Sequence, residues 1–151
     1  MLKVLKFGGT SMADAGQYQK VAAIVRADPT RKVVVVSAAG KRFAEDNKIT
    51  DLLYLCHAHL QYGVSCESIF ATVRERYLAI RDALGLKTDL ESALDALEKK
   101  MRTGISREEL VSRGEYLSAR LMADFLDFDF IDATRWLFFR YDGTVDQERS
   151  Y

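Results

Sequence analysis

The feature that most constrains the fold is a pair of β-rich apolar runs separated by one helix-length segment. Residues 2–7 are mostly apolar and stop at Gly8-Gly9, while residues 32–37 (KVVVVS) contain four consecutive valines. Between them, up to Asp28-Pro29, apolar side chains recur at helical spacing: Tyr18, Val21, Ala22 and Val25. The pattern predicts a βαβ unit with parallel strands, and the valine run predicts a second strand that is covered on both faces.

A polar loop and a long helical region follow the second predicted strand. Residues 38–48 contain a glycine and many charged side chains, which is typical of a surface loop. Helical patterns then cover residues 50–62, 65–84, 89–101 and 106–126, separated by Gly63, Gly85 and Gly104. The last of these segments has a single apolar stripe, formed by Leu110, Leu117, Leu121 and Phe125.

The end of the chain returns to β-type patterns. Residues 128–133 (FDFIDA) alternate and predict a third strand, and residues 136–139 (WLFF) predict a short β-type run before a turn at residues 141–143. We therefore predict an α/β fold with a helical excursion between its second and third strands. These strands are too few for a finished doubly wound sheet, which favours a fragment or a half that needs the rest of its domain.

Composition places the chain among globular proteins and excludes several classes of partner. Its 151 residues fit one domain, and 22 basic side chains balance 22 acidic ones, so no net charge attracts nucleic acid or anionic lipid. No apolar run is long enough to span a membrane, and the first residues do not form a signal peptide. Cys56 and Cys66 lack CxxC spacing, which fits a reducing compartment, so we expect a cytoplasmic protein.

The segment KFGGTS at residues 6–11 is the sharpest local motif. Glycines allow backbone amides to approach a phosphate closely, the start of the following helix adds partial positive charge, and Lys6 adds a full one. The spacing matches neither GxxxxGK[ST] nor GxGxxG, so a plain strand-to-helix turn explains these residues equally well. In either case Thr10 or Ser11 is expected to cap the helix.

Several segments occur in an order that resembles one family: KFGGTS, VVVVSA with its glycine loop, KITDLL at residues 48–53, LVSRGEYLSARLMADFL at residues 110–126, and FDFIDA. Together they resemble the aspartate kinases of the amino-acid-kinase family. The resemblance implies a three-layer α/β sandwich with a mainly parallel sheet, of which residues 1–151 would form the N-terminal half. It also implies phosphorylation of the L-aspartate side chain to 4-phospho-L-aspartate, the first step of lysine, threonine and methionine biosynthesis, with ATP and Mg²⁺.

The resemblance also implies roles for individual residues. Lys6, Gly8, Gly9 and Thr10 would contact the phosphates, with Lys6 as the catalytic residue, and Ser37 would face the same site. Thr50 and Glu115 would bind the L-aspartate substrate. No catalytic base is needed, because the acceptor carboxylate is already ionised at neutral pH.

Each of the substrate residues has a structural alternative. Glu115 suits the α-ammonium group of the substrate, but a surface glutamate that pairs with Arg113 or Arg120 would look the same. Gly114 favours the functional interpretation, because a glycine inside a helix indicates a close backbone contact. Thr50 could serve as the N-cap of a helix that begins at Asp51.

Two further clusters are interpreted as structural. Cys56, His57 and His59 provide only three candidate metal ligands, so a core cysteine beside partly exposed histidines is preferred and no metal site is predicted in the chain. Residues 41–46 mix bases and acids, which indicates a solvated or mobile rim of the active site rather than a nucleic-acid patch.

The resemblance stops before the nucleotide-binding half of the family, since the chain contains no GRGGSD-type motif and no regulatory domain. We therefore expect residues 1–151 to supply the phosphate loop and the amino-acid pocket, and to be inactive alone. Two alternatives remain: a non-catalytic fragment that self-associates through its open sheet as a homo-oligomer, and a related kinase that acts on glutamate.

Overall fold

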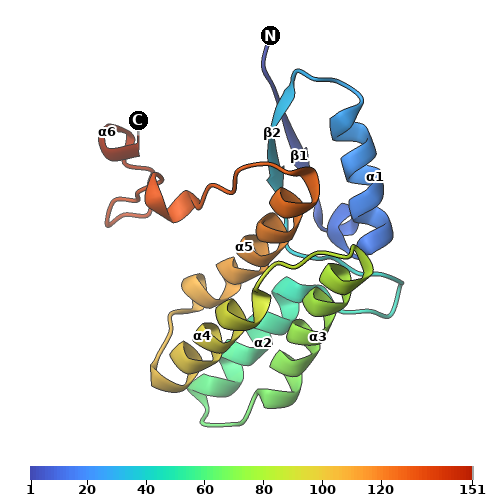
Figure 1. Cartoon of the computed structure of the whole chain (residues 1–151). Coiled ribbons are helices and arrows are strands. Elements are labelled where there is room, and N and C mark those ends of the chain that lie inside the picture. Colours follow the sequence, from blue (N-terminus) through green and yellow to red (C-terminus); the bar gives the residue numbers. More distant parts are fainter. Residues whose placement is uncertain (151) are drawn as a thin grey trace.

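The computed structural model describes residues 1–150, and its N-terminal part is the expected βαβ unit (Figure 1). Strand β1 (Lys3–Phe7) leads through a short 3₁₀ helix, η1 (Gly9–Met12), into helix α1 (Ala15–Arg26), and β2 (Arg31–Val36) returns parallel to β1. Leu5 lies opposite Val34 and Phe7 opposite Val36. The parallel pairing confirms the α/β class, in a two-stranded sheet.

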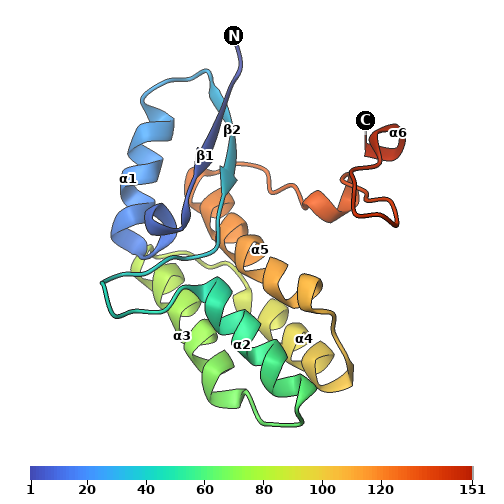
Figure 2. The ribbon, with the colours of Figure 1, turned by 180° about the vertical axis from the view of Figure 1, so that it is seen from behind.

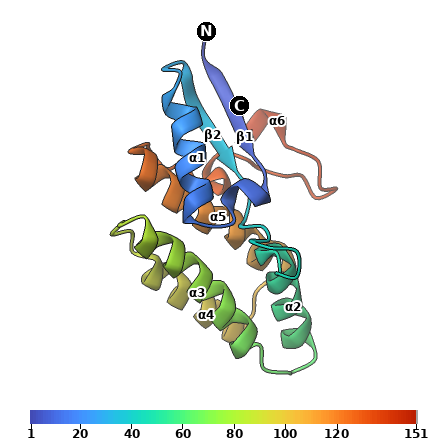
Figure 3. The same ribbon diagram turned by 90° about the vertical axis from the view of Figure 1, so that its right-hand side faces the viewer.

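Four helices form the excursion that was expected after β2: α2 (Ile49–Gln61), α3 (Glu67–Ala83), α4 (Leu90–Thr103) and α5 (Arg107–Leu126). Helix α2 packs against α3 and α5, and α4 packs against the same two helices, below the sheet and α1 (Figures 1 and 3). Gly63, Gly85 and Gly104 lie between the helices with positive φ angles, as glycine allows without steric cost. Among the helices in residues 1–150, none is long and apolar enough to cross a membrane.

A single apolar core connects the sheet with these helices. The predicted stripe of α1 is buried at Tyr18, Val21, Ala22 and Val25, and that of α5 at Leu110, Leu117 and Leu121. On the sheet, Leu5, Phe7, Val34 and Val36 face this core. The helical periodicities therefore identified the buried faces correctly.

The opposite face of the sheet is open, which corrects one expectation. Val33 and Val35 keep 40% and 48% of their surface exposed, and Val4 on β1 keeps 63%. The prediction that β2 is covered on both faces is therefore wrong for the described part of the chain. The alternation along a strand puts Val33 and Val35 opposite to Val34 and Val36, and no element within residues 1–150 covers that side.

The predicted strand at residues 128–133 is also wrong, because both ends of this segment serve neighbouring helices. Asp127 adopts a left-handed conformation (φ 58°) after α5, and the amide of Phe128 bonds to the Ala123 carbonyl, 2.8 Å away. At the other end, Asp132 caps the 3₁₀ helix η2 (Ala133–Arg135). Phe130 packs edge-on against Tyr116 of α5, so its apolar side chain is used on a helix instead of a sheet.

The last residues extend away from the helices (Figure 2). In place of the β-type run at residues 136–139, only an isolated antiparallel bridge joins Phe139 to Val145, across the predicted turn at residues 141–143. A short helix, α6 (Gln147–Ser150), ends the described chain. This segment does not pair with the β1–β2 sheet, which keeps two strands in the described part of the chain.

Candidate functional site

The glycine loop after β1 leaves its backbone and its hydroxyl groups accessible. A Cβ atom on Gly8 would meet nothing within 4 Å, and Thr10 is exposed. The expectation that Thr10 or Ser11 caps α1 is wrong, because Asp14 does so: its carboxylate accepts a hydrogen bond of 2.9 Å from the Gln17 amide. The hydroxyls of Thr10 and Ser11 are therefore not used by the helix cap.

The turn after β2 lies directly against this glycine loop. The Gly40 amide donates to the Gly9 carbonyl at 2.8 Å, and a Cβ atom on Gly40 would lie 2.6 Å from the carbonyl carbon of Gly9. No larger residue fits at Gly40 without separating the two segments. We call residues 38–40 the central turn, because the other parts of the site are attached to it.

Helix α2 begins at the central turn, two residues earlier than expected. The Ile49 amide donates to the Ala39 carbonyl at 2.9 Å, and the helix starts at Ile49 rather than at Asp51. Its N-cap is Lys48, whose side chain makes no capping bond. The predicted N-cap role of Thr50 is therefore wrong: Thr50 lies half-buried inside the first turn of the helix.

Helix α5 approaches the central turn through Gly114. A Cβ atom at this position would lie 2.6 Å from the Cβ of Ala38 and 3.4 Å from a methyl group of Ile49. The expected close contact at Gly114 is confirmed, and it places the neighbouring Glu115 at the same junction. Glu115 is exposed and forms no ion pair within residues 1–150.

The arginines that could have paired with Glu115 are engaged elsewhere. The guanidinium of Arg113 lies over the Tyr116 ring, 4.8 Å from its centre, and Arg120 donates to the Tyr116 hydroxyl at 3.2 Å. The structural alternative, a surface ion pair, is therefore not formed. A carboxylate remains free beside the central turn.

Tyr77 of α3 fastens the central turn to α5 from inside the core. Its hydroxyl donates to the Gly114 carbonyl at 2.7 Å and accepts from the Ala39 amide at 3.2 Å. Because the single hydroxyl proton is used on Gly114, the Ser118 hydroxyl, 3.0 Å away, must be the donor of the third bond. Burial raises the pKa of Tyr77 to about 12, so it stays a neutral donor at neutral pH.

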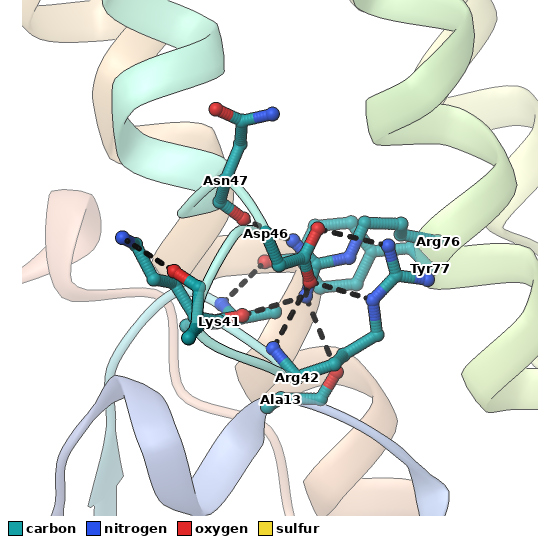
Figure 4. A network of polar contacts seen from close by, with 10 residues as sticks. Ala13, Lys41, Arg42, Asp46, Asn47, Arg76 and Tyr77 are labelled. Carbon is teal, nitrogen blue, oxygen red and sulfur yellow. Dashed lines mark hydrogen bonds and ion pairs between the residues drawn. The ribbon is translucent and has the colours of Figure 1, made fainter.

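A second polar network fixes the loop between the central turn and α2 (Figure 4). Asp46 is 9% exposed and accepts from the Nε of Arg42 at 2.7 Å and from the Arg42 amide at 3.0 Å. These bonds from Arg42 hold the pKa of Asp46 well below its usual range. The rim predicted at residues 41–46 is thus solvated at Lys41 and Arg42 but anchored at Asp46.

The guanidinium of Arg76 lies behind this loop. It donates to three carbonyl oxygens, those of Gly40 at 2.6 Å, Asn47 at 2.7 Å and Ala13 at 3.3 Å. The Asp46 carboxylate is 3.8 Å away. Through Arg76, helix α3 therefore contacts the central turn, the loop that leads into α2 and the residue that follows η1.

Lys6 and Ser37 lie at the ends of the two strands. Lys6 is exposed, pairs in register with Val35 on the open face, and has no carboxylate partner among the described residues. The Ser37 amide donates to the Phe7 carbonyl at 3.1 Å, which extends the strand pairing by one residue. Three backbone segments, at Gly9, at the start of α2 and at Gly114-Glu115, therefore meet at the central turn. The Lys6 amine lies free at the neighbouring edge of the sheet.

The sequence-based predictions did not include Arg76 or Tyr77, although the sequence contains a signal for Arg76. Phe70, Val73, Tyr77 and Ile80 form the buried face of α3, and Arg76 falls on that face. A charged residue at a core position of an amphipathic helix has to find buried acceptors. That conflict between charge and position could have identified Arg76.

The cysteine–histidine segment lies away from this junction, on α2. Cys56 is buried and both histidines are half-buried, as expected. Burial raises the pKa of the Cys56 thiol to about 12. Over residues 1–150, no group of three or more histidine, cysteine, aspartate or glutamate side chains is placed to hold a metal ion.

Comparison with known proteins identifies the family. The model of the amino acid kinase family matches residues 1–149. The chain belongs to the amino acid kinase family. Within it, the chain is 38% identical over 138 residues to Aspartokinase 3 of Bacillus subtilis, a match that covers 87% of this chain and 30% of that protein.

Solved structures of amino acid kinases agree with the fold. The chain matches the crystal structure of Clostridium acetobutylicum aspartate kinase with a TM-score of 0.95 and 41% identity, over 99% of this chain and 35% of that one. It also matches Escherichia coli aspartokinase III, solved in complex with aspartate and ADP, with a TM-score of 0.68 and 27% identity, over 84% of this chain and 29% of that one. The chain therefore spans about a third of the length of these relatives.

Proposed function

We propose that this chain supplies the phosphate loop and the amino-acid pocket of an aspartate kinase, which transfers the γ-phosphoryl group of ATP to the side-chain carboxylate of L-aspartate. The observation that carries this assignment is that Gly9, Ile49 next to Thr50, and Gly114 next to Glu115 all contact the central turn. Two of the solved relatives support the substrate, since one is an aspartate kinase and the other was solved with aspartate and ADP.

On the phosphate side, the glycine loop fits a polyphosphate. The open space at Gly8 allows backbone amides to approach an anion, and the hydroxyls of Thr10 and Ser11 are not used by the α1 cap. Lys6 would neutralise charge on the transferring phosphoryl group, assisted by Ser37 at the end of β2. Mg²⁺ enters only as the ion that nucleotide phosphates normally carry, with few protein ligands of its own.

On the acceptor side, Glu115 and Thr50 suit an amino acid. The unpaired Glu115 carboxylate would bind the α-ammonium group of L-aspartate through a charge-assisted hydrogen bond, which selects an amino acid over a plain diacid. Thr50, at the start of α2, would orient the substrate with its hydroxyl. The reacting carboxylate is already ionised, so the chain needs to position it and screen its charge, without a general base.

Because the chain spans 30% of the Bacillus subtilis relative, activity is best measured in a chimera. Replacing the matching segment of that enzyme by residues 1–151 should give ADP formation that depends on L-aspartate. Lys6→Ala should lower the rate about 100-fold or more, the usual effect of removing one group that stabilises transition-state charge. Turnover unchanged by Lys6→Ala would remove Lys6 from the mechanism.

We also place the reaction in the cytoplasm, in the biosynthesis of lysine, threonine and methionine. The compartment is supported by Cys56 and Cys66, which are both free thiols in the described chain. The pathway is supported by the aspartokinase relatives alone.

A second candidate is self-association of this polypeptide as a homo-oligomer without catalysis. It is favoured by the open sheet face, where Val4, Val33 and Val35 are exposed beside unpaired strand edges. Sedimentation velocity over a range of concentrations tests this candidate. Val35→Lys should then reduce association, while Val64→Lys in the α2–α3 loop, where Val64 is 52% exposed, serves as the matched control.

A further inference from the structure

Arg76 is a buried guanidinium that has no close carboxylate partner of its own in the described part of the chain. Its side chain is 4% exposed, and its nearest carboxylate, Asp46, is 3.8 Å away and is already bonded to Arg42. Burial lowers the pKa of Arg76, which reflects the cost of removing a guanidinium from water. Within residues 1–150 its Nε has no hydrogen-bond partner.

Such an arrangement is poorly suited to adding stability. Replacing buried charges by apolar side chains of similar volume is often neutral for stability or increases it. What the guanidinium does provide is geometry, since its planar fork donates in fixed directions to several acceptors at once. All three of its acceptors are backbone carbonyls that lie outside the regular helices and strands.

The three carbonyls belong to the segments that form the proposed site. Gly40 lies in the central turn and bonds to Gly9 of the glycine loop. Ala13 directly follows η1, so it fixes the far end of the same loop. Asn47 lies three residues before Thr50, at the entry to α2. One side chain thus fixes the phosphate loop, the central turn and the start of the substrate helix relative to one another (Figure 4).

We propose that Arg76 is a positioning residue, which holds the glycine loop and the start of α2 at the separation that phosphoryl transfer to the substrate requires. The link between Arg76 and phosphoryl transfer rests on the proposed function, whereas the hydrogen bonds of Arg76 do not depend on it. Arg76 acts through backbone carbonyls and touches no reacting group. Its removal should therefore loosen the central turn more than it destabilises the molecule.

Amide hydrogen exchange on the 151-residue chain separates these two effects. The Gly40 and Ile49 amides report on the central turn, because they bond to the carbonyls of Gly9 and Ala39. The Leu117 amide, inside α5, reports on the core. In Arg76→Met, protection of Gly40 and Ile49 should fall about tenfold or more relative to Leu117, as expected for local opening.

Two matched variants complete the test. Arg74→Met, on the same helix as Arg76, removes the ion pairs of Arg74 with Asp95 and Glu98 of α4 and should change none of the three amides selectively. Arg76→Lys keeps donors at the site and should restore part of the lost protection, and it replaces Arg76→Met as the test variant if the latter does not fold. Equal loss at all three amides, or no change at Gly40 and Ile49, would overturn the positioning role. Neither result depends on aspartate or ATP, so a failure here is distinguishable from a failure of the proposed function.

Discussion

At the scale of single residues, Glu115 carries the specificity of the proposed reaction. It lies next to Gly114, whose missing side chain lets α5 contact Ala38, and it has no ion-pair partner in the described chain. A free carboxylate beside a junction of three backbone segments is well placed for an ammonium group.

Glu115→Gln should therefore weaken the use of L-aspartate in the chimera. Loss of a hydrogen bond to a charged group costs about 1.5–3 kcal/mol, which corresponds to about a 10- to 100-fold decrease of kcat/KM for L-aspartate. The KM for ATP should stay nearly constant. Glu108→Gln is the control, because Glu108 is an exposed glutamate of the same helix that pairs with Arg107. An equal effect of both substitutions would contradict the role of Glu115.

Asp46 makes the stability of the site region dependent on pH. Because its folded pKa is lowered by Arg42, its contribution is fully present above the pKa of an unfolded aspartate, about 3.9, and is lost as the pH falls toward the folded value. Asp46→Asn should lower the free energy of unfolding at pH 7 by about 1.5–3 kcal/mol. Denaturant unfolding at several pH values should show a smaller acid-induced loss in the variant. The same acid slope in both proteins would contradict this account.

At the scale of elements, the sequence was most informative where periodicity decides the structure. The helical stripes at Tyr18–Val25 and Leu110–Leu121 were predicted correctly, because every fourth or third residue has to face the core. The β-pattern of residues 128–133 failed, because Asp127 and Asp132 use their local capping chemistry and Phe130 packs on Tyr116. Alternation shows which side chains share a face, but it does not supply a partner strand.

In the candidate site too, features that depend on neighbouring residues could be predicted, whereas contacts between distant residues could not. Gly8, Gly9 and Gly114 could be recognised from the motif and from the cost of glycine in a helix. The central turn could not, since Ala39, Gly114 and Tyr77 meet only through contacts between residues far apart in sequence. The capping roles expected for Thr10, Ser11 and Thr50 failed because neighbouring residues begin those helices.

The close packing of the central turn against the glycine loop predicts a strong effect of Gly40→Ala. The added methyl group would lie 2.6 Å from a backbone carbon of Gly9, so the two segments have to separate. Overpacking of this kind costs about 1–3 kcal/mol of unfolding free energy, measured by chemical denaturation. Gly8→Ala is the control and should change stability by less than about 0.5 kcal/mol, since open space surrounds that position. A larger loss for Gly8→Ala would show that the packing is assigned to the wrong glycine.

At the scale of the whole molecule, the described chain has a closed side and an open side. Its helices bury a continuous core against one face of the sheet, while Val33 and Val35 remain exposed on the other. Lys6 lies on that open face, at the edge where the glycine loop begins. The helices, the central turn and Arg76 together fix the amino-acid side of the proposed site, and the phosphate side opens toward the uncovered face.

The most direct test of this account is the identity of the product. The chimera, supplied with ATP, Mg²⁺ and hydroxylamine, should convert L-aspartate into its side-chain hydroxamate, because hydroxylamine traps the acyl phosphate that forms on the carboxylate. The rate should be much higher with L-aspartate than with L-glutamate, and Glu115→Gln should lower it while Glu108→Gln does not. Formation of glutamate hydroxamate in preference, or a rate that does not respond to Glu115→Gln, would contradict the assignment of an aspartate pocket at the central turn.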